Sequence, residues 1–514
     1  MKQSTPDPAA DPASPTLVAT LTEAAELESC PPELLRRVGL IELRADLVGD
    51  LDPAWLAEHW EGPVLYTLRS RVEGGRGEPR SEDRASRLIA AAERFELIDL
   101  EAERDLTPEL LRAIPAERRV LSWHGGVGEL DELRRTVERM DEAGGRHLKL
   151  APSATRSGQE LAPLDLVAEL GRTDVTAFAT GEIGAWTRLV AAALGAPLLF
   201  GSLGERPAAP GQPSLRRLAL DYELPRPLRP VPLFGIVGRP VSHSLSPRLH
   251  NRAYRRLGVD ALYLAFHAEQ FGDFWLEVVE DDRFERWGMP LVGLSVTSPF
   301  KETALAVAGA SSPRAQAIGG ANTMVRRRGV WEAESTDPEG VLEPLRRRGV
   351  ELAGARAAVV GCGGAGRAAA VGLDRARARV TLFNRSENRG RRAAQELDLE
   401  LGSLAAFDPS EFDVVVHATS LGHHPSDPLP FDPTALRPQA ILVDMVYDHH
   451  ETPLVTVARA AGRATVGGRE VLLCQAIGQF RAMTGEELPW DLAVDALGLD
   501  PRAVGGAPAP GGSS

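Results

Sequence analysis

The chain has 514 residues, 43% hydrophobic and 25% charged, with a formal net charge of −14. This length exceeds one ordinary core and predicts two or three domains, while the charge argues against nucleic acid or an anionic membrane as partner. The three cysteines show neither metal-ligand nor disulfide spacing, which predicts no metal site and fits a reducing cytoplasm. Residues 1–15, which lack a signal-peptide core, and 504–514 are expected to be disordered tails.

The first half alternates short apolar runs with amphipathic segments. The runs lie at 17–21, 40–43, 63–68, 95–100, 119–123, 147–150, 175–179 and 197–200. Eight strands with a helical pattern between each pair are typical of a (β/α)8 TIM barrel, with a flavodoxin-like open sheet as the alternative. We predict a barrel over 16–221, with its chemistry on the rim formed by the carboxyl ends of the strands.

A new α/β pattern follows a proline-rich segment. Residues 222–232 carry four prolines and are expected to be a semi-rigid linker. Apolar β-rich runs then occur at 233–237, 262–266, 291–296 and 323–326, a βαβ series runs from 357 to about 465, and 470–498 has a helical pattern. We predict a substrate domain made of 233–340 with 470–500, and a Rossmann domain over 341–469.

Lysine is almost absent from this chain, which has 55 Arg but only Lys2, Lys149 and Lys301. The Arg guanidinium stays protonated, so it cannot serve as an amine nucleophile or readily pass a proton. Lys149 and Lys301 lie in different halves at the ends of apolar runs, which indicates two active sites. Chance survival of a few lysines is the alternative.

Polar residues at the predicted barrel rim surround Lys149. They include His124, Glu73, Arg44, Arg69 and Arg188. Arginines near a partly dry amine lower its pKa and leave a neutral nucleophile for a ketone. The resulting imine acidifies the neighbouring carbon, so His124 could take a proton there and return it to a leaving hydroxyl. The pattern predicts a Schiff-base dehydration or an aldol-type cleavage.

Six ordered motifs over about 17–220 resemble the type I 3-dehydroquinate dehydratases. They are Glu42-Leu-Arg44-Ala-Asp46, Thr67-Leu-Arg69 with Glu73-Gly-Gly75, Ser122-Trp-His124, Lys149-Leu-Ala, Gly184-Ala-Trp-Thr-Arg188 and Ala209-Pro-Gly-Gln212. The resemblance implies that Lys149 forms an imine with 3-dehydroquinate, that His124 is the acid and base, and that Glu73 orients it. It also implies binding of the ring oxygens by Glu42, Arg44 and Arg69, and of the carboxylate by Arg188 and Gln212. Ala208 and Gly125-Gly126 depart from the family pattern.

A glycine-rich loop, Gly361-Cys-Gly-Gly-Ala-Gly366-Arg367, follows a β-rich run and opens a helical pattern, as a dinucleotide fingerprint requires. Glycines let the backbone approach a pyrophosphate at a helix N-terminus. The cofactor residues expected here are Gly361, Gly363, Gly364, Ala365 and Gly366. The next run ends in Asn384-Arg385, where an NAD enzyme usually offers an acid, so Arg385 favours NADP.

Further motifs resemble shikimate dehydrogenase over 233–500. They are Ser242-His-Ser244-Leu-Ser246-Pro247, Val296-Thr297-Ser-Pro-Phe-Lys301-Glu, Gly320-Ala-Asn322-Thr, Thr336-Asp337-Pro-Glu-Gly340, Ala418-Thr419-Ser-Leu-Gly422, Asp444-Met-Val-Tyr447, Thr452-Pro-Leu454 and Gln475-Ala. The resemblance implies a substrate site of Ser244, Ser246, Thr297, Asn322, Asp337 and Gln475. Lys301 and Asp337 would move the hydroxyl proton, and Thr419 and Tyr447 would contact the cofactor. Ser295, Ser335, His417 and Val471 depart from the common pattern.

The two resemblances imply consecutive reactions. 3-Dehydroquinate would lose water to give 3-dehydroshikimate, which NADPH would reduce to shikimate. We predict a fused, bifunctional, cytoplasmic enzyme that acts on small molecules and has no nucleic-acid or membrane partner. Two alternatives stay open: the second half is a catabolic quinate/shikimate dehydrogenase, or the chain is a non-catalytic sensor of pathway intermediates.

Overall fold

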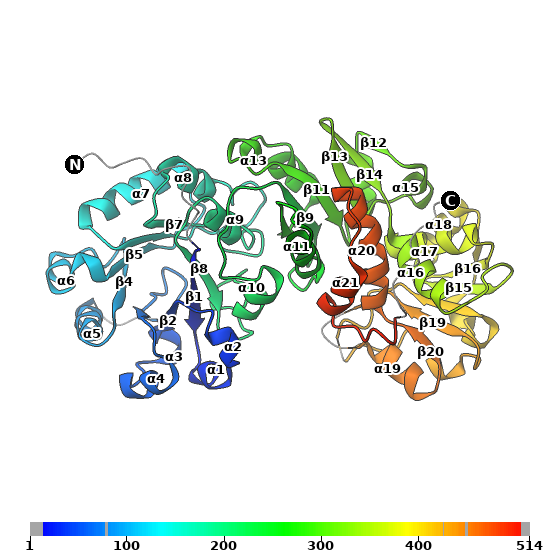
Figure 1. The fold of residues 1–514 in the computed structure, drawn as a ribbon, viewed down its shortest axis with the longest axis horizontal. Helices are drawn as coiled ribbons and strands as arrows, with labels where there is room; N and C mark the ends of the chain where they lie inside the picture. The colour runs from blue at the N-terminus through cyan, green and yellow to red at the C-terminus, as the bar shows by residue number, and fades with distance from the viewer. Residues whose placement is uncertain (1–13, 78–80, 425, 448–450, 505–514) are drawn as a thin grey trace. The chain divides into compact units, whose positions relative to one another are not determined.

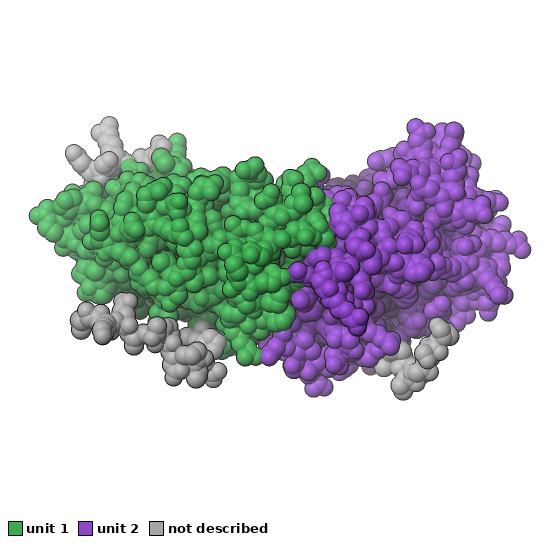
Figure 2. All heavy atoms as spheres, turned by 90° about the horizontal axis from the view of Figure 1, so that it is seen from above, with its two compact units in different colours: residues 1–232, 264–291 green, residues 233–263, 292–514 purple. Residues whose placement is uncertain are grey.

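The computed structural model describes residues 14–77, 81–424, 426–447 and 451–504. The tails expected at the two ends, apart from residues 14, 15 and 504, lie outside the described residues. The chain forms two compact units, one of residues 1–232 with 264–291 and one of 233–263 with 292–514 (Figure 2). Among the described residues, no helix is both long enough and apolar enough to cross a membrane.

The first unit contains an eight-stranded parallel sheet in the order β7-β6-β5-β4-β3-β2-β1-β8 (Figure 1). Its strands are β1(Thr16–Leu21), β2(Leu40–Arg44), β3(Val64–Thr67), β4(Leu97–Glu101), β5(Arg119–Trp123), β6(His147–Leu150), β7(Val175–Ala177) and β8(Leu198–Ser202). β1 pairs with both β2 and β8, and the Leu198 N–H donates to Thr176 Oγ1 (3.3 Å) at the seam between β8 and β7. The barrel is therefore nearly closed, which confirms the barrel prediction and excludes the open sheet.

Helices connect the barrel strands, and some of them begin after a side chain that accepts a hydrogen bond from the first turn. Thr107 accepts the Leu110 N–H before α6, and Ser214 accepts the Arg217 N–H before α10. The helices are α1(Ala24–Ser29), α2(Pro32–Leu35), α3(Ala45–Val48), α4(Pro53–His59), α5(Ser81–Ala92), α6(Pro108–Ala113), α7(Leu130–Ala143), α8(Ala162–Leu170), α9(Thr187–Ala193) and α10(Leu215–Asp221).

Two segments beyond the barrel pack on it within the same unit. In the segment expected to be a linker, Leu224 is buried and its carbonyl accepts a hydrogen bond from Arg37 Nη1 (2.8 Å). Residues 264–291 carry α12(Phe271–Phe274) and α13(Arg283–Arg286). There Arg283 Nε and Trp287 Nε1 donate to Asp165 (2.7 and 3.2 Å). Both segments thus behave as parts of the barrel unit.

The next sheet along the chain is mixed, with the order β10-β9-β11-β13-β14-β12. Its strands are β9(Leu233–Gly238), β10(Leu262–His267), β11(Leu291–Val296), β12(Ala310–Ser311), β13(Thr323–Arg327) and β14(Val330–Glu334). Its helices are α11(Ser246–Leu257), α14(Lys301–Val307) and α15(Pro313–Ile318). β13 runs antiparallel to both β11 and β14, so the end of β11 and the start of β13 meet at one edge.

A parallel sheet follows in the order β17-β16-β15-β18-β19-β20 (Figure 1). The strands are β15(Arg356–Val360), β16(Arg379–Phe383), β17(Glu400–Leu401), β18(Val414–His417), β19(Ile441–Asp444) and β20(Ala464–Val466). The helices are α16(Asp337–Arg347), α17(Gly364–Arg375), α18(Glu387–Leu397), α19(Pro453–Ala460), α20(Gly468–Thr484) and α21(Trp490–Ala496). This doubly wound sheet confirms the Rossmann prediction.

One expected element differs from the structure. The helical pattern over 470–498 forms two helices, because α20 ends at Gly485, whose φ is +79°, and α21 begins only at Trp490. A left-handed residue cannot continue an α-helix, and glycine adopts that conformation without steric cost.

Candidate active sites

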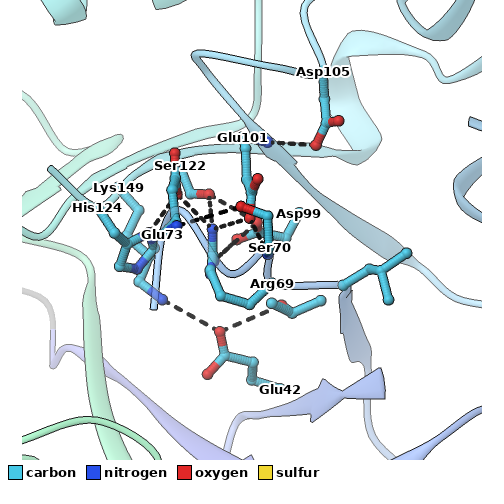
Figure 3. A network of polar contacts seen from close by, with 12 residues as sticks. Glu42, Arg69, Ser70, Glu73, Asp99, Glu101, Asp105, Ser122, His124 and Lys149 are labelled. Atoms are coloured by element: carbon cyan, nitrogen blue, oxygen red, sulfur yellow. Dashed lines mark hydrogen bonds and ion pairs between the residues drawn. The ribbon is translucent and has the colours of Figure 1, made fainter. Parts of the chain in front are cut away.

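Lys149 lies on β6 inside the barrel, where its amine is buried. Its Nζ donates a hydrogen bond to Glu42 Oε1 (3.2 Å; Figure 3). The same nitrogen lies 3.9 Å from the centre of the Phe200 ring. Burial lowers the pKa of the Lys149 amine, and the positive charge of Arg69 adds to this, although Glu42 opposes it. The site therefore favours the neutral amine more than water does.

Glu42 is the carboxylate that faces this amine. It accepts hydrogen bonds from the hydroxyls of Thr20 (2.8 Å) and Thr67 (3.3 Å). Burial alone would raise the pKa of Glu42, but the nearby charges of Lys149 and the arginines outweigh it and hold the pKa at about 2. Glu42 is thus ionised at any physiological pH.

His124 and Glu73 form a second pair at the rim. His124 Nδ1 lies 3.0 Å from Glu73 Oε2. Burial and the charges of Arg69 and Lys149 lower the pKa of His124 well below its usual value. Burial also raises the pKa of Glu73 to about 8, assisted by Glu101 and Asp99 and opposed by Arg69. At neutral pH the imidazole and the carboxyl group are therefore both mainly uncharged.

Arg69 is surrounded by acceptors, and Figure 3 shows it at the centre of this network. Its Nη1 donates to Ser122 Oγ (2.8 Å), Glu73 Oε2 (3.0 Å) and Glu101 Oε1 (3.3 Å), and its Nη2 donates to Asp99 (3.0 Å). Its terminal nitrogens therefore serve the protein's own carboxylates, which limits their use for direct contact with a substrate.

Two other predicted binding residues are also held by protein groups. Arg44 makes a bidentate pair with Asp46 (2.8 and 2.9 Å). Gln212 donates to Thr20 Oγ1 (2.9 Å) and accepts the Ala208 N–H (3.0 Å). The hydrogen bond from Ala208 is made by its backbone N–H, which any residue type except proline could supply at that position.

Asp99 was missing from the expected barrel site. It lies on β4 two residues before Glu101 and also accepts a hydrogen bond from Ser122 Oγ (2.7 Å). Because side chains alternate across a strand, Asp99 and Glu101 share one face. Two acids at that spacing in a run of apolar residues were the available signal.

Arg188 lies on α9, with its guanidinium carbon 4.5 Å from the centre of the Phe178 ring. Its Nη1 donates to the Gly211 carbonyl (3.2 Å), and its Nε has no hydrogen-bond partner among the described residues. Burial lowers the pKa of Arg188 to about 9. A buried guanidinium with a free donor is suited to an anion, because a carboxylate would compensate its charge.

The second unit contains a cavity of about 120 Å³. Of the predicted residues, its lining includes Ser246, Thr297, Lys301, Asn322, Asp337, Ala365, Tyr447 and Gln475. Ser244 is not part of the lining and accepts the Ser246 N–H (3.2 Å). Gln479 and Met445 line the cavity but were not expected; the spacing of Gln475 and Gln479, one helical turn apart, was a usable signal.

Lys301 and Asp337 begin α14 and α16 and meet in this cavity. Lys301 Nζ donates to Asp337 Oδ2 (2.5 Å), and Asn322 Nδ2 donates to Asp337 Oδ1 (2.8 Å). Asn322 is fixed in turn, because its Oδ1 accepts the Thr336 N–H (2.9 Å) and the Thr323 hydroxyl (2.8 Å). The ammonium and carboxylate are thus held side by side at a polar cavity.

The glycine-rich loop has the shape of a dinucleotide cradle. Gly361 has a φ of +109°, and a Cβ on Gly366 would lie 1.8 Å from the Gly361 carbonyl oxygen. A Cβ on Gly364 would lie 3.1 Å from Lys301 Cδ, so the loop adjoins the cavity. Asn384 Oδ1 accepts the Cys362 N–H (3.0 Å) and braces the loop. Arg385 is exposed at the end of β16.

A barrel with a buried amine, followed by a Rossmann unit with a Lys–Asp pair beside a glycine-rich loop, defines a two-site α/β enzyme, a lyase joined to an oxidoreductase. Residues 18–226 match the family model of type I 3-dehydroquinase, and residues 236–324 match that of the shikimate dehydrogenase substrate binding domain. The chain belongs to the type I 3-dehydroquinases in its first half and to the shikimate dehydrogenases in its second.

Named relatives show the same division. The chain is 29% identical over 485 residues to the chloroplastic bifunctional 3-dehydroquinate dehydratase/shikimate dehydrogenase of Arabidopsis thaliana, covering 88% of this chain and 79% of that protein. It is 35% identical over 262 residues to the NADP(+) shikimate dehydrogenase of Methanothrix thermoacetophila, covering 51% and 94%. It is 37% identical over 267 residues to the NADP(+) shikimate dehydrogenase of Halobacterium salinarum, covering 50% of this chain and 95% of that protein.

Proposed function

We propose that the chain dehydrates 3-dehydroquinate in its barrel and reduces the product to shikimate with NADPH in its second unit. The observation that carries the first reaction is the buried amine of Lys149, which faces a ring and a single carboxylate. Only a neutral amine attacks a ketone. Burial lowers the pKa of the Lys149 amine and so favours its neutral form. Lys149 is therefore the residue that forms the imine.

His124 acts as base and then as acid, and Glu73 orients it. The cationic imine acidifies the adjacent C–H, and His124 Nε2, which faces away from Glu73, takes that proton. The same nitrogen gives the proton to the hydroxyl on the next carbon, which leaves as water. Hydrolysis of the imine frees Lys149, so the net change is the loss of one water.

Arg188 is the partner of the substrate carboxylate, because its buried guanidinium has an unused donor. Glu42 and Gln212, which both bond Thr20, hold polar groups of the bound ring and its carboxylate. Arg44 and Arg69 act mainly through their charge, since Asp46 and the carboxylates around Arg69 occupy much of their hydrogen-bonding capacity.

Lys301 and Asp337 carry the proton in the second reaction. An ammonium beside a carboxylate polarises a carbonyl and stabilises the alkoxide that develops on it. The hydroxyl and amide groups of the cavity suit a polyhydroxylated ring. The substrate residues proposed there are Ser246, Thr297, Asn322 and Gln475, with Ser244 supporting Ser246.

NADP is the proposed cofactor, and NADPH supplies the hydride when it is bound. Residues 361, 363, 364, 365 and 366 of the glycine-rich loop would hold the pyrophosphate at the start of α17. Arg385 and Asn384 follow β16, where they would contact the adenosine ribose of the cofactor, and the arginine favours a 2′-phosphate. The NADP(+) in the names of two relatives supports this choice.

The proposed location is the cytoplasm, and the proposed partners are small molecules. Three free cysteines suit a reducing compartment, and the charge of −14 disfavours nucleic acid as partner. The Arabidopsis relative is named as chloroplastic.

One assay tests both sites together. Purified protein receives NADPH and 3-dehydroquinate, and we expect NADPH oxidation because both sites act in series. Lys149→Arg should abolish NADPH oxidation with 3-dehydroquinate. The same variant should still oxidise NADPH when it is given 3-dehydroshikimate. Activity with 3-dehydroshikimate alone would refute the dehydratase half, and inactivity with both would favour the sensor alternative. Faster turnover of quinate than of shikimate in the reverse direction would favour the catabolic alternative.

A further inference from the structure

Four polar side chains form a hydrogen-bonded chain at the ends of β18 and β19, in which His417, Asp444 and Thr452 are buried and Thr419 is half-buried. His417 and Asp444 are 1% and 0% exposed and lie opposite each other in the sheet. His417 Nδ1 lies 2.9 Å from Asp444 Oδ1, and His417 Nε2 lies 2.6 Å from Thr419 Oγ1. Thr452 Oγ1 donates to Asp444 Oδ2 (2.5 Å). A buried chain of this kind is costly unless every member is satisfied.

The donors around Asp444 indicate which ring nitrogen of His417 carries a proton. Asp444 also accepts the Val446 N–H (3.1 Å), so several donors converge on it, as suits an ionised carboxylate that only accepts. His417 Nδ1 therefore carries a proton and donates it to Asp444. In the neutral imidazole Nε2 is then an acceptor, and the Thr419 hydroxyl donates to it. The remaining capacity of Thr419 Oγ1 is to accept.

Thr419 belongs to a loop that touches the glycine-rich turn. Its Oγ1 accepts the Leu421 N–H (3.2 Å), which fixes the loop after β18. A Cβ on Gly361 would lie 2.6 Å from the Ala418 carbonyl oxygen and 3.0 Å from the Thr419 nitrogen. The loop and the cradle are therefore in direct contact.

Asp444 also accepts a hydrogen bond from the backbone of a second loop, the loop that follows β19. Its bond to the Val446 N–H lies between Met445 and Tyr447, and both of these residues line the substrate cavity. The pair of His417 and Asp444 thus connects a loop that touches the cofactor cradle with a loop that lines the substrate cavity.

We propose that His417 is a positioning residue. Its imidazole, fixed by Asp444, orients the Thr419 hydroxyl and holds the loop after β18 in place relative to the loop after β19. The inference rests on the proposed dehydrogenase function. Because the Thr419 donor is used by His417, Thr419 can only accept from a bound dinucleotide, so it would recognise an N–H or O–H group of the cofactor.

Two amide variants separate the two ring nitrogens. In His417→Asn the amide takes the place of Nδ1 and keeps the bond to Asp444, but it does not reach Thr419. In His417→Gln the amide takes the place of Nε2 and reaches Thr419, but it leaves Asp444. Since the proposal needs both bonds, each variant should raise the Kd for NADPH about tenfold, measured by NADPH fluorescence. His59→Asn, an imidazole in the barrel unit, is the matched control and should leave this Kd unchanged.

A double-mutant cycle tests the coupling. Thr419→Val should also raise the Kd for NADPH, and Thr419→Ser should bind NADPH more tightly than Thr419→Val. The double variant Thr419→Val/His417→Asn should bind NADPH no more weakly than the weaker of the two single variants. Proton NMR gives a readout that a packing role would not move. A strongly deshielded imidazole N–H signal should be present in the unaltered chain and in Thr419→Val, and absent from His417→Gln and Asp444→Asn.

The outcomes are distinct. Normal NADPH affinity in His417→Asn, or additive losses in the cycle, would overturn the positioning role while the dehydrogenase assignment stands. Failure of the unaltered chain to bind NADPH would overturn the assignment itself. If a His417 variant does not fold, shown by a changed circular dichroism spectrum, the two Thr419 variants decide, because equal affinity for NADPH in Thr419→Ser and Thr419→Val would refute the proposal.

Discussion

Replacing Glu73 with glutamine should alter how dehydration depends on pH. In the proposed mechanism His124 Nε2 must be unprotonated to remove a proton from the substrate. An ionised Glu73 accepts the Nδ1–H and leaves Nε2 free, whereas a protonated Glu73 donates to Nδ1 and leaves the proton on Nε2. The ionisation of Glu73 therefore controls whether His124 can act as the base.

The size of the effect follows from the pKa of Glu73. Burial raises it from 4.5 to about 8, which corresponds to roughly 5 kcal/mol against ionisation. A raised pKa means that the base form is absent at low pH and appears as the pH rises through 8. Near pH 7 about one tenth of the pair is in the base form, so kcat should rise roughly tenfold between pH 7 and 9. Glu73→Gln should lower kcat by about 100-fold and remove this rise.

The assay is the absorbance of the conjugated product across this pH range. Lys149 also titrates, so imine formation is measured separately by borohydride trapping and mass spectrometry at each pH. Glu138→Gln, an exposed carboxylate on α7, is the matched control. An unchanged pH profile in Glu73→Gln, with trapping also unchanged, would show that Glu73 does not set the protonation of His124.

Three other substitutions test single contacts. Arg188→Met should raise the KM for 3-dehydroquinate by roughly 10- to 100-fold with a smaller effect on kcat, because it removes a charge-assisted bond; an unchanged KM would place the carboxylate elsewhere. Lys301→Met should reduce 3-dehydroshikimate reduction at least 100-fold while borohydride trapping at Lys149 continues, and loss of both would indicate misfolding. Arg385→Ala should weaken NADPH far more than NADH, and equal losses would contradict the 2′-phosphate contact.

Much of the architecture was predictable because it depends on local patterns. The eight barrel runs and the glycine-rich turn are encoded by nearby residues, and the structure contains a strand at each of those runs and a helix starting at Gly364. The break between α20 and α21 was missed because the apolar periodicity continues on both sides of Gly485. A single glycine inside a helical pattern gives only a weak signal.

The site was less predictable where partners come from distant strands. Arg69 matched a substrate-binding motif, but its terminal nitrogens are occupied by carboxylates from β4 and by Glu73, and no local pattern predicts this competition. The surroundings of Arg188 likewise depend on Phe178 and Gly211, which only the folded barrel brings near. Residue types were readable from the sequence, whereas the share of each hydrogen-bonding group left for a ligand was not.

The segment 264–291 limits how modular this fusion can be. Its buried aromatic residues, including Phe266 and Phe284, pack on Trp186 of the barrel, with ring centres 5.2 and 5.7 Å apart. Excising the second half at residue 233 would carry this segment away and expose both apolar surfaces to water. Separately expressed halves should therefore aggregate or re-associate. Two free-standing enzymes could not arise from this chain by a single cut unless polar residues also replaced the apolar ones on both exposed surfaces.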